Sequence, residues 1–152
     1  MGLDMFLTKH VFVGANYEHR NVTGKVDIKV GDELLDIPFK KISKIVLEAC
    51  YWRKANAIHK WFVDNCQDGI DECQVTYVSK EQLTELLDLC KQVKKNHNLA
   101  HSLLPSESGF FFGGTEYDEW YFDSINYTIR ELTKLLDHKD VDCGEFYYQS
   151  SW

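Results

Sequence analysis

The order in which strand-like and helix-like patterns follow one another restricts the fold of this chain more than any other feature. The first forty residues read as strands. Leu3–Val13 is rich in branched and aromatic residues, and apolar residues alternate with charges over 26–30, which is typical of a half-buried strand. Residues 31–33 are expected to form a turn that leads into 34–37. Three segments with helical periodicity follow, a short strand pattern at 74–78 lies between the first two, and Phe146–Tyr148 is expected as a last strand. We predict an α+β fold with a small, mainly antiparallel sheet and about three helices packed on it.

The first predicted helix begins after Pro38 and runs to about Cys66. Its apolar side chains recur at spacings of three or four residues, which is typical of one buried helical face. This stripe comprises Leu47, Tyr51, Ala55, Ile58 and Phe62.

Two further helices carry both an apolar stripe and a start signal. Ser79 and Gln82 have the spacing of a capping box, and Thr115 is the expected cap of the last helix. The stripes comprise Leu83, Leu86, Leu87, Cys90 and Val93 in one helix, and Tyr121, Ile125, Ile129, Leu132 and Leu136 in the other.

Length and charge narrow the class of protein. With 152 residues, 44% of them hydrophobic, the chain can bury a core without disulfides, so we predict a single domain over residues 1–152. The net charge of −7 is unevenly placed, because residues 105–152 hold 10 acids and 3 bases whereas residues 1–104 hold 14 of each. This balance argues against general nucleic-acid binding, which needs a basic surface.

The cysteines and the apolar runs indicate a compartment. The five cysteines are odd in number and lack the spacing of a zinc site, so we expect free thiols in a reducing cytoplasm. The first residues lack the features of a signal peptide, and no apolar run reaches the eighteen or so residues of a membrane span. We expect a cytoplasmic protein with no membrane contact, no metal site and no cofactor.

The densest polar and aromatic group lies at 51–62, within the first predicted helix. On a helix, Trp52, Asn56 and His59 would share one edge between the buried stripe and solvent. Such a ridge suits a planar, nucleotide-type ligand whose phosphate Arg53 and Lys60 could neutralise. The alternative is structural, with Trp52 and His59 as rim residues of the core.

The loop at 106–115 is the second candidate region, with three glycines around the run Phe110–Phe112. Gly113 and Gly114 could present backbone N–H groups to an anion, but two acids follow them and no lysine does, so a ribose hydroxyl or a cation fits better than phosphate. The alternative is an aromatic plug that docks the loop on the core. The ligand-binding residues predicted from this part of the chain are Ser108, Gly109, Thr115 and Tyr117.

The last predicted helix offers an acidic surface with two large aromatic residues. Exposed tryptophan and tyrosine among carboxylates are typical of a protein-binding patch. The alternative is a solvated face whose Trp120 is covered by the C-terminal segment. The predicted partner-binding residues are Glu116, Asp118, Glu119, Trp120, Asp123 and Tyr127.

No catalytic signature is present. His97 and His101 lack the intervening glutamate of a zinc-protease motif, and no Ser or Cys nucleophile can be assigned a His partner from spacing alone. The sequence therefore favours a non-enzymatic protein, with a small nucleotide-processing hydrolase as the enzymatic alternative.

Five segments carry a resemblance. They are MGLDM at 1–5, YWRKANAIHKWF at 51–62, SGFFFG at 108–113, TEYD at 115–118 and YQSSW at 148–152. In these segments the chain resembles a group of small phage- and prophage-encoded proteins of no assigned activity. The resemblance implies a phage accessory role and supplies no catalytic residues, and it does not cover residues 14–40 and 67–104.

For a small phage protein of this kind we expect a non-enzymatic inhibitor of bacterial antiviral defence. It would bind either a nucleotide-like ligand, through the ridge and the loop, or a defence protein such as a CRISPR nuclease, through the acidic residues 105–152. The sequence leaves the oligomeric state open. It also leaves open whether the acidic third pairs internally with a basic segment comprising Lys40, Lys41, Lys44, Arg53, Lys54 and Lys60.

Overall fold

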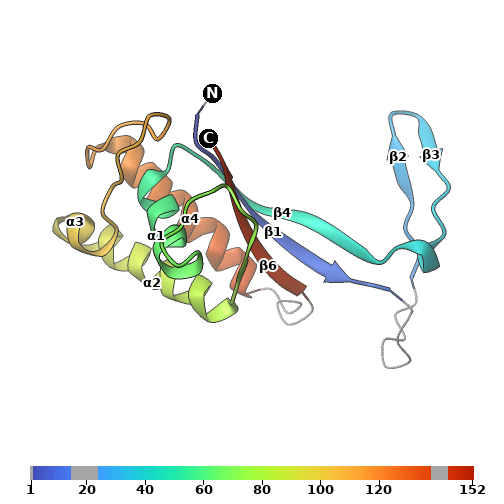
Figure 1. Cartoon of the computed structure of the whole chain (residues 1–152). Helices are drawn as coiled ribbons and strands as arrows, with labels where there is room; N and C mark the ends of the chain where they lie inside the picture. The colour runs from blue at the N-terminus through green and yellow to red at the C-terminus, as the bar shows by residue number, and fades with distance from the viewer. Residues whose placement is uncertain (1, 15–23, 138–143) are drawn as a thin grey trace.

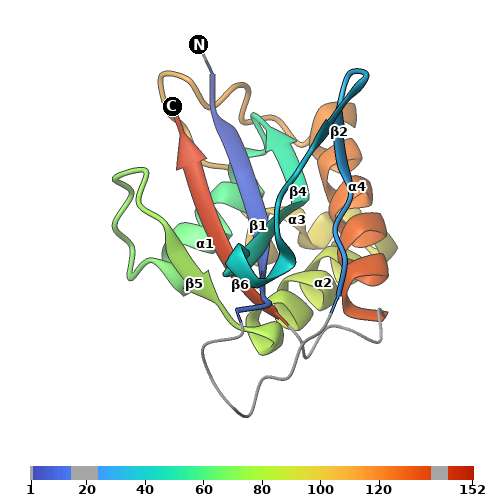
Figure 2. The ribbon, with the colours of Figure 1, turned by 90° about the vertical axis from the view of Figure 1, so that its right-hand side faces the viewer.

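A computed structural model describes residues 2–14, 24–137 and 144–152, and it arranges them in two layers with a projecting arm (Figures 1 and 2). One layer is a four-stranded antiparallel sheet with the strand order β4-β1-β6-β5. The strands are β1 (Asp4–Phe12), β4 (Lys44–Arg53), β5 (Thr76–Val78) and β6 (Gly144–Ser151). The strands predicted near both ends of the chain and at 74–78 are thereby confirmed.

The second layer is helical and covers one face of the sheet (Figures 1 and 2). Its α-helices are α1 (Asn56–Cys66), α2 (Lys80–Lys95), the short α3 (Ala100–Leu103) and α4 (Glu119–Asp137), and a 3-10 turn, η2 (His97–Leu99), precedes α3. The α+β class is confirmed, and the described part of the chain contains four α-helices rather than about three.

Strand β1 lies at the centre of the core. Its residues Met5 and Leu7, and Leu3 just before it, point toward the helices and have no solvent exposure. Phe146 and Tyr148 of β6 flank them on the same face, and the Tyr148 ring stacks on Phe62 of α1 at 4.0 Å between centroids. Burial therefore alternates along the first predicted strand, as it does when one face of a strand packs on a core.

The second predicted helix is confirmed in detail. All five residues of its apolar stripe are buried in α2, and both hydrogen bonds of the capping box at Ser79 and Gln82 are present. In α4, Tyr121, Ile125 and Leu132 are buried, and Ile129 and Leu136 pack against the core at its edge. The predicted cap Thr115 is wrong, because α4 begins at Glu119 and the Asp118 carboxylate accepts the Tyr121 N–H.

The first predicted helix is wrong over its first half. Residues 44–53 form strand β4, which pairs along its length with β1, and the helix begins only at Asn56. Of the predicted stripe, Leu47 and Tyr51 are exposed in the strand, and only Ala55, Ile58 and Phe62 are buried. Between the two elements Lys54 adopts a positive φ of 55°, which ends the strand and turns the chain into α1.

Strands β2 (Ile28–Val30) and β3 (Glu33–Leu35) form a separate hairpin that stands away from the sheet and the helices (Figure 1). We call residues 24–43 the arm; it also includes the 3-10 turn η1 (Phe39–Lys41). The predicted alternation and the turn at Gly31 are confirmed, and Gly31 has a positive φ of 63°. The predicted half-burial is wrong, because every residue of β2 and β3 is exposed.

In the segments that the structure describes, every helix is too short or too polar to cross a bilayer.

The capping box gives a first prediction. Replacing Ser79 by alanine removes the acceptor for the Gln82 N–H and should lower the free energy of unfolding by about 1 kcal/mol. Urea denaturation should show a lower midpoint with an unchanged slope. Lys91→Ala, at an exposed position of the same helix, is the control and should leave the midpoint unchanged. An equal loss in both variants would contradict a specific contribution of the cap.

Candidate functional site

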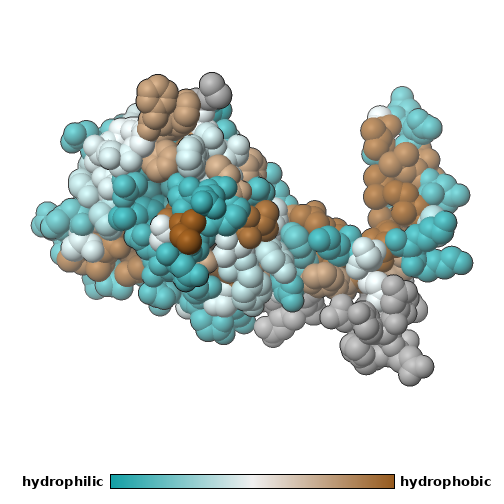
Figure 3. Space-filling model, viewed as in Figure 1, coloured by the Kyte–Doolittle hydropathy of each residue, from teal (hydrophilic) through white to brown (hydrophobic). Residues whose placement is uncertain are grey.

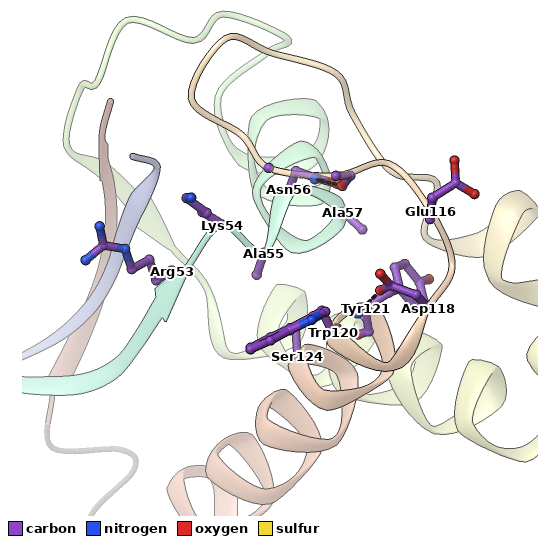
Figure 4. Close-up of a pocket in the computed structure, with 12 residues that line it drawn as sticks. Arg53, Lys54, Ala55, Asn56, Ala57, Glu116, Asp118, Trp120, Tyr121 and Ser124 are labelled. Carbon is purple, nitrogen blue, oxygen red and sulfur yellow. Dashed lines mark hydrogen bonds between the residues drawn. The ribbon is translucent and has the colours of Figure 1, made fainter. Parts of the chain in front are cut away.

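A cavity of about 320 Å³ lies where the end of β4 and the start of α1 face the start of α4 (Figure 4). It brings together two stretches of chain, 53–57 and 113–124, that are far apart in sequence. Its lining residues are Arg53, Lys54, Ala55, Asn56, Ala57, Gly113, Gly114, Glu116, Asp118, Trp120, Tyr121 and Ser124.

The Trp120 ring is the main apolar surface of this cavity. Its side chain is 82% exposed although it belongs to a helix that otherwise packs on the core. Figure 4 shows the ring edge-on, with one face turned toward Ala55 and Ala57 across the cavity. Small side chains on the far wall and an open indole face leave room for a flat group to stack.

Charged side chains of both signs lie around the cavity. Arg53 and Lys54 lie at one side and Glu116 and Asp118 at the other, and the two cationic head groups point outward rather than over Trp120 (Figure 4). The Lys54 position is held by its backbone N–H, which donates to Leu3 O at 2.8 Å. One edge of a flat ligand on Trp120 would therefore meet the carboxylates of Glu116 and Asp118. Arg53 and Lys54 would lie beyond its other edge.

Asn56 builds the wall between α1 and the loop. Its Nδ2 donates to the carbonyl oxygens of Phe112 at 3.1 Å and Gly114 at 2.8 Å, and its Oδ1 accepts the Glu107 N–H at 3.1 Å. The side chain is buried, so these three bonds form away from competing water. Asn56 thus fixes the loop against the helix and gives the cavity its shape.

His59 lies in a different environment. It is 1% exposed, and its Nε2 lies 2.9 Å from the Asp71 carboxylate. A carboxylate only accepts, so Nε2 carries the proton, and in the neutral ring Nδ1 accepts from the Tyr148 hydroxyl at 2.7 Å. Burial raises the pKa of Tyr148 well above its usual value, which keeps that hydroxyl protonated as a donor.

A second hollow of about 250 Å³ borders His59 on the other side of the loop. Lys60 crosses its edge and pairs with Asp64 at 3.1 Å and Glu107 at 3.0 Å. The hydrogen bonds from these carboxylates raise the pKa of Lys60, so the ammonium stays charged. Ser108 lines the same hollow.

The predicted ridge of Trp52, Asn56 and His59 is wrong as a geometric unit, because the three residues do not share one helix. Trp52 belongs to β4, is 3% exposed, and donates through Nε1 to Thr128 Oγ1 at 2.9 Å. Of the residues predicted from 51–62, Arg53 and Asn56 border the cavity, whereas His59 and Lys60 border the second hollow.

The loop at 106–115 closes on itself and on the core. The Phe112 ring is buried and meets the His59 ring edge-on at 5.0 Å, whereas Phe110 is 96% exposed. Gly109 packs so closely over Phe112 that an added Cβ would lie 2.6 Å from that ring. The aromatic plug alternative therefore describes Phe112 correctly.

The other two predicted loop residues help to hold the loop. Thr115 O accepts from the Ser106 hydroxyl at 2.7 Å. The Tyr117 hydroxyl accepts the Ser106 N–H at 3.4 Å, and its ring packs edge-on against Tyr121. Both residues thereby join the two ends of the loop.

The predicted partner-binding residues are split as well. Glu119, Trp120 and Asp123 are exposed on α4, and Glu116 and Asp118 precede that helix. Tyr127 is half-buried, and its hydroxyl accepts the Tyr51 N–H at 3.2 Å. The C-terminal segment does not bury Trp120, which leaves the indole open to solvent.

The basic segment and the acidic third do not form one internal ion-pair network among the described residues. The ion pair between Lys60 and Glu107 is a contact between the basic segment and the acidic third. Lys40 and Lys41 lie in the arm, and Lys44 follows it at the start of β4. Most of both surfaces is therefore exposed.

Sequence reasoning missed Lys54, Ala55, Ala57, Tyr121 and Ser124 as cavity residues. Alanines have no chemical signature, and they matter here only because their small size leaves space over Trp120. The usable signal was Trp120 itself, an aromatic residue opposite the buried stripe of its helix.

The described residues contain no group of three or more His, Cys, Asp and Glu side chains placed to hold a metal ion. Burial raises the pKa of Cys50, Cys66 and Cys90 to about 12, so these thiols stay protonated near neutral pH. Thiolate chemistry at these three positions is disfavoured.

The chain was compared with family models, curated proteins and solved structures, and nothing in any of the three matches it.

Asn56 supplies the second prediction. Asn56→Ala leaves two carbonyl groups and one N–H near the cavity without their partner, and the free energy of unfolding should fall by about 2–4 kcal/mol. Urea denaturation measures the loss, and hydrogen exchange at Glu107 should speed up. Asn126→Ala, at an exposed position of α4, should change neither quantity; stability unchanged in both variants would contradict the role given to Asn56.

Proposed function

We propose that this protein is a non-enzymatic binder of a nucleotide-type small ligand, which it holds in the cavity over Trp120. The base would stack on the indole, its polar edge or the ribose would meet the carboxylates of Glu116 and Asp118, and the phosphate would reach Arg53 and Lys54. The observation that carries the proposal is an indole 82% exposed in a cavity bordered by two cations and two carboxylates.

The start of α1 adds to this arrangement. Ala55, in the capping position, has no side-chain hydrogen bond to the helix, and the first turn contains no acid. The N–H groups of this turn therefore add positive potential on the side where Arg53 and Lys54 lie. This favours an anionic group at that side of the cavity and the base at the other.

Binding fits this cavity better than hydrolysis. Its lining contains no cysteine and no histidine, and the Ser124 hydroxyl donates to Tyr121 O within α4. The Asp118 carboxylate is engaged in capping α4. The lining can hold a ligand but offers no activated nucleophile beside a general base.

In a phage context, which the sequence resemblance implies, such a binder would act by sequestration. Antiviral defence that signals through a nucleotide would be blocked when the protein holds the signal in stoichiometric amounts. Inhibition of the defence response should then rise with protein concentration, and each protein molecule should remove no more than one ligand molecule from solution.

The third prediction tests the cavity. Trp120→Ala should weaken binding of the best ligand from a panel of linear and cyclic nucleotides roughly 5- to 150-fold, the range expected for a lost stacking energy of about 1–3 kcal/mol. Arg53→Ala should weaken phosphate-bearing ligands more than the matching nucleosides. Isothermal titration calorimetry measures both effects.

Phe110→Ala is the matched control, because Phe110 is also a solvent-exposed aromatic residue of this region but does not line the cavity. It should leave affinity unchanged. The proposal fails if no nucleotide binds, or if Phe110→Ala and Trp120→Ala weaken binding equally. Turnover of the ligand by catalytic amounts of protein would point to the hydrolase instead.

A second candidate is a protein-binding inhibitor that uses the acidic side of α4. It is favoured by the exposure of Trp120 between the carboxylates of Glu119 and Asp123. Such a surface could enter the basic nucleic-acid groove of a defence nuclease.

The fourth prediction separates the two candidates. Glu119→Lys with Asp123→Lys should weaken association with such a nuclease at least about tenfold, and added salt should weaken the wild-type complex as the charges are screened. Nucleotide affinity should change little. Glu85→Lys with Asp88→Lys, on the exposed side of α2, is the charge-matched control. The assay measures how well the protein displaces DNA from the nuclease. Inhibition through the acidic side of α4 is ruled out if added salt does not weaken the complex, or if the two double variants displace DNA equally well.

A further inference from the structure

The arm has one mainly apolar face that no described part of the chain covers. The register pairs Ile28 with Leu35 and Val30 with Glu33, so these four residues share one side of the hairpin, with Glu33 close to the turn at Gly31. Val30 is 64% exposed, and Ile28 and Leu35 are each 38% exposed. This side is an amphipathic hairpin face without its packing partner.

An isolated two-stranded hairpin is at best marginally stable in water. The two strands of the arm pair only with each other in a sheet separate from the main one, and Ser43 at the end of the arm accepts the N–H groups of Val13 and Gly14. The apolar side chains therefore need a second surface to bury against.

The main sheet presents such a surface, because helices cover only one of its faces. Seen from the side of the arm, the strands lie in front of α1 and α2 (Figure 2). The uncovered face is rich in aromatic rings: Phe6 packs on Tyr51 at 5.3 Å, and Tyr147 packs on both His10 at 4.4 Å and Tyr77 at 5.9 Å. Val46 of the edge strand is 50% exposed beside them.

The arm and this open face border one concave space. Figure 3 shows open space between the arm and the rest of the molecule, with the hydrophobic side of the arm turned toward it. The arm of the same chain does not fill that space. A copy of the arm from another molecule presents an apolar face that can pack on the rings there.

We propose that two copies of this chain form a two-fold symmetric dimer in which the arm of each lies across the open sheet face of the other. Each contact is then made twice, as two-fold symmetry requires. Ile28, Val30 and Leu35 of one copy cover the aromatic rings of its partner, and the same burial occurs at the second arm.

The size of the arm suits a stable dimer. All twenty residues of 24–43 are exposed or half-buried. One face of the arm and the open sheet face of the same copy would both enter the contact, so each partner's contribution approaches the roughly 20–30 residues of a standard interface.

Charge also favours a second copy as the occupant. The arm contains four lysines and four acids, so it is neutral, whereas the remaining residues carry the whole net charge of −7. Two copies that met through their acidic α4 surfaces would repel each other, but a neutral arm can approach the acidic partner without that cost.

Nucleic acid is a poorer occupant of the same aromatic face. The Tyr51 hydroxyl donates to the Asp4 carboxylate, and the Tyr147 hydroxyl donates to Glu145 at 2.7 Å. These hydrogen bonds place negative charge among the rings, where a phosphate backbone would be repelled.

The fifth prediction concerns the mass of the protein in solution. Sedimentation velocity of the full chain between about 1 and 500 µM should show a monomer–dimer equilibrium. The double variant Val30→Glu/Leu35→Glu should raise the dimer dissociation constant at least about tenfold, because it places charges in the buried face. Far-UV circular dichroism should stay unchanged, since both positions lie outside the core.

The double variant Ile70→Glu/Phe110→Glu is the charge-matched control, because both residues are apolar and exposed but lie in loops outside the arm and the open sheet face. It should dimerise like the wild type. The proposal is overturned if the protein is a monomer at every concentration, or if the arm variant dimerises like the wild type. It is also overturned if the arm binds single-stranded RNA or lipid vesicles and no dimer forms.

Discussion

The pairing of β1 with β4 is the interaction on which the rest of the structure depends. β1 has partners on both sides, so Met5 and Leu7 of this strand, with Leu3 just before it, can form the floor of the core. β4 covers the edge of β1 that β6 leaves open, carries the arm at its first residue and enters the α1 turn at its last. Its ten residues therefore set the separation between the arm and the cavity at roughly 30 Å, given a rise of about 3.3 Å per residue.

Strand β4 is also where the sequence was most misleading. In KIVLEACYWR the apolar residues can be read with a spacing of four, and the helix that does begin at Asn56 extends this apparent stripe. Strand pairing overrides that pattern, because Cys50 and Trp52 alternate with exposed Tyr51 and Arg53 once β1 lies alongside. The pairing joins residues 32 to 49 positions apart, and a local pattern contains no such information.

By contrast, α2 could be predicted almost completely, because its signals are local. The capping box joins positions three apart, and its apolar stripe repeats every three or four residues. The arm was predictable as a hairpin for the same reason. Its exposure was not, since a strand pattern indicates which residues share a face but not whether another surface covers that face.

The candidate site was predictable in part. Pairing the 51–62 segment with the glycine loop correctly brings Arg53 and Asn56 beside Gly113 and Gly114. The helical assumption, however, placed Trp52 and His59 beside them, whereas both are buried structural residues. Trp120, assigned from sequence to a protein-binding patch, is the exposed aromatic residue of the cavity lining, so the proposed ligand site combines two surfaces that the sequence analysis treated separately.

The distance set by β4 has a consequence for how the two proposals combine. The cavity lies beyond the last residue of β4 and the arm precedes its first, so an arm-mediated dimer would leave both cavities open to solvent. No cavity residue belongs to the arm, and ligand binding should therefore not require dimerisation. A dimer would hold two ligands with equal affinity unless binding changes the Lys54 turn that joins β4 to α1. Coupling would have to pass through that turn, because β4 is the element that links the arm directly to the cavity wall.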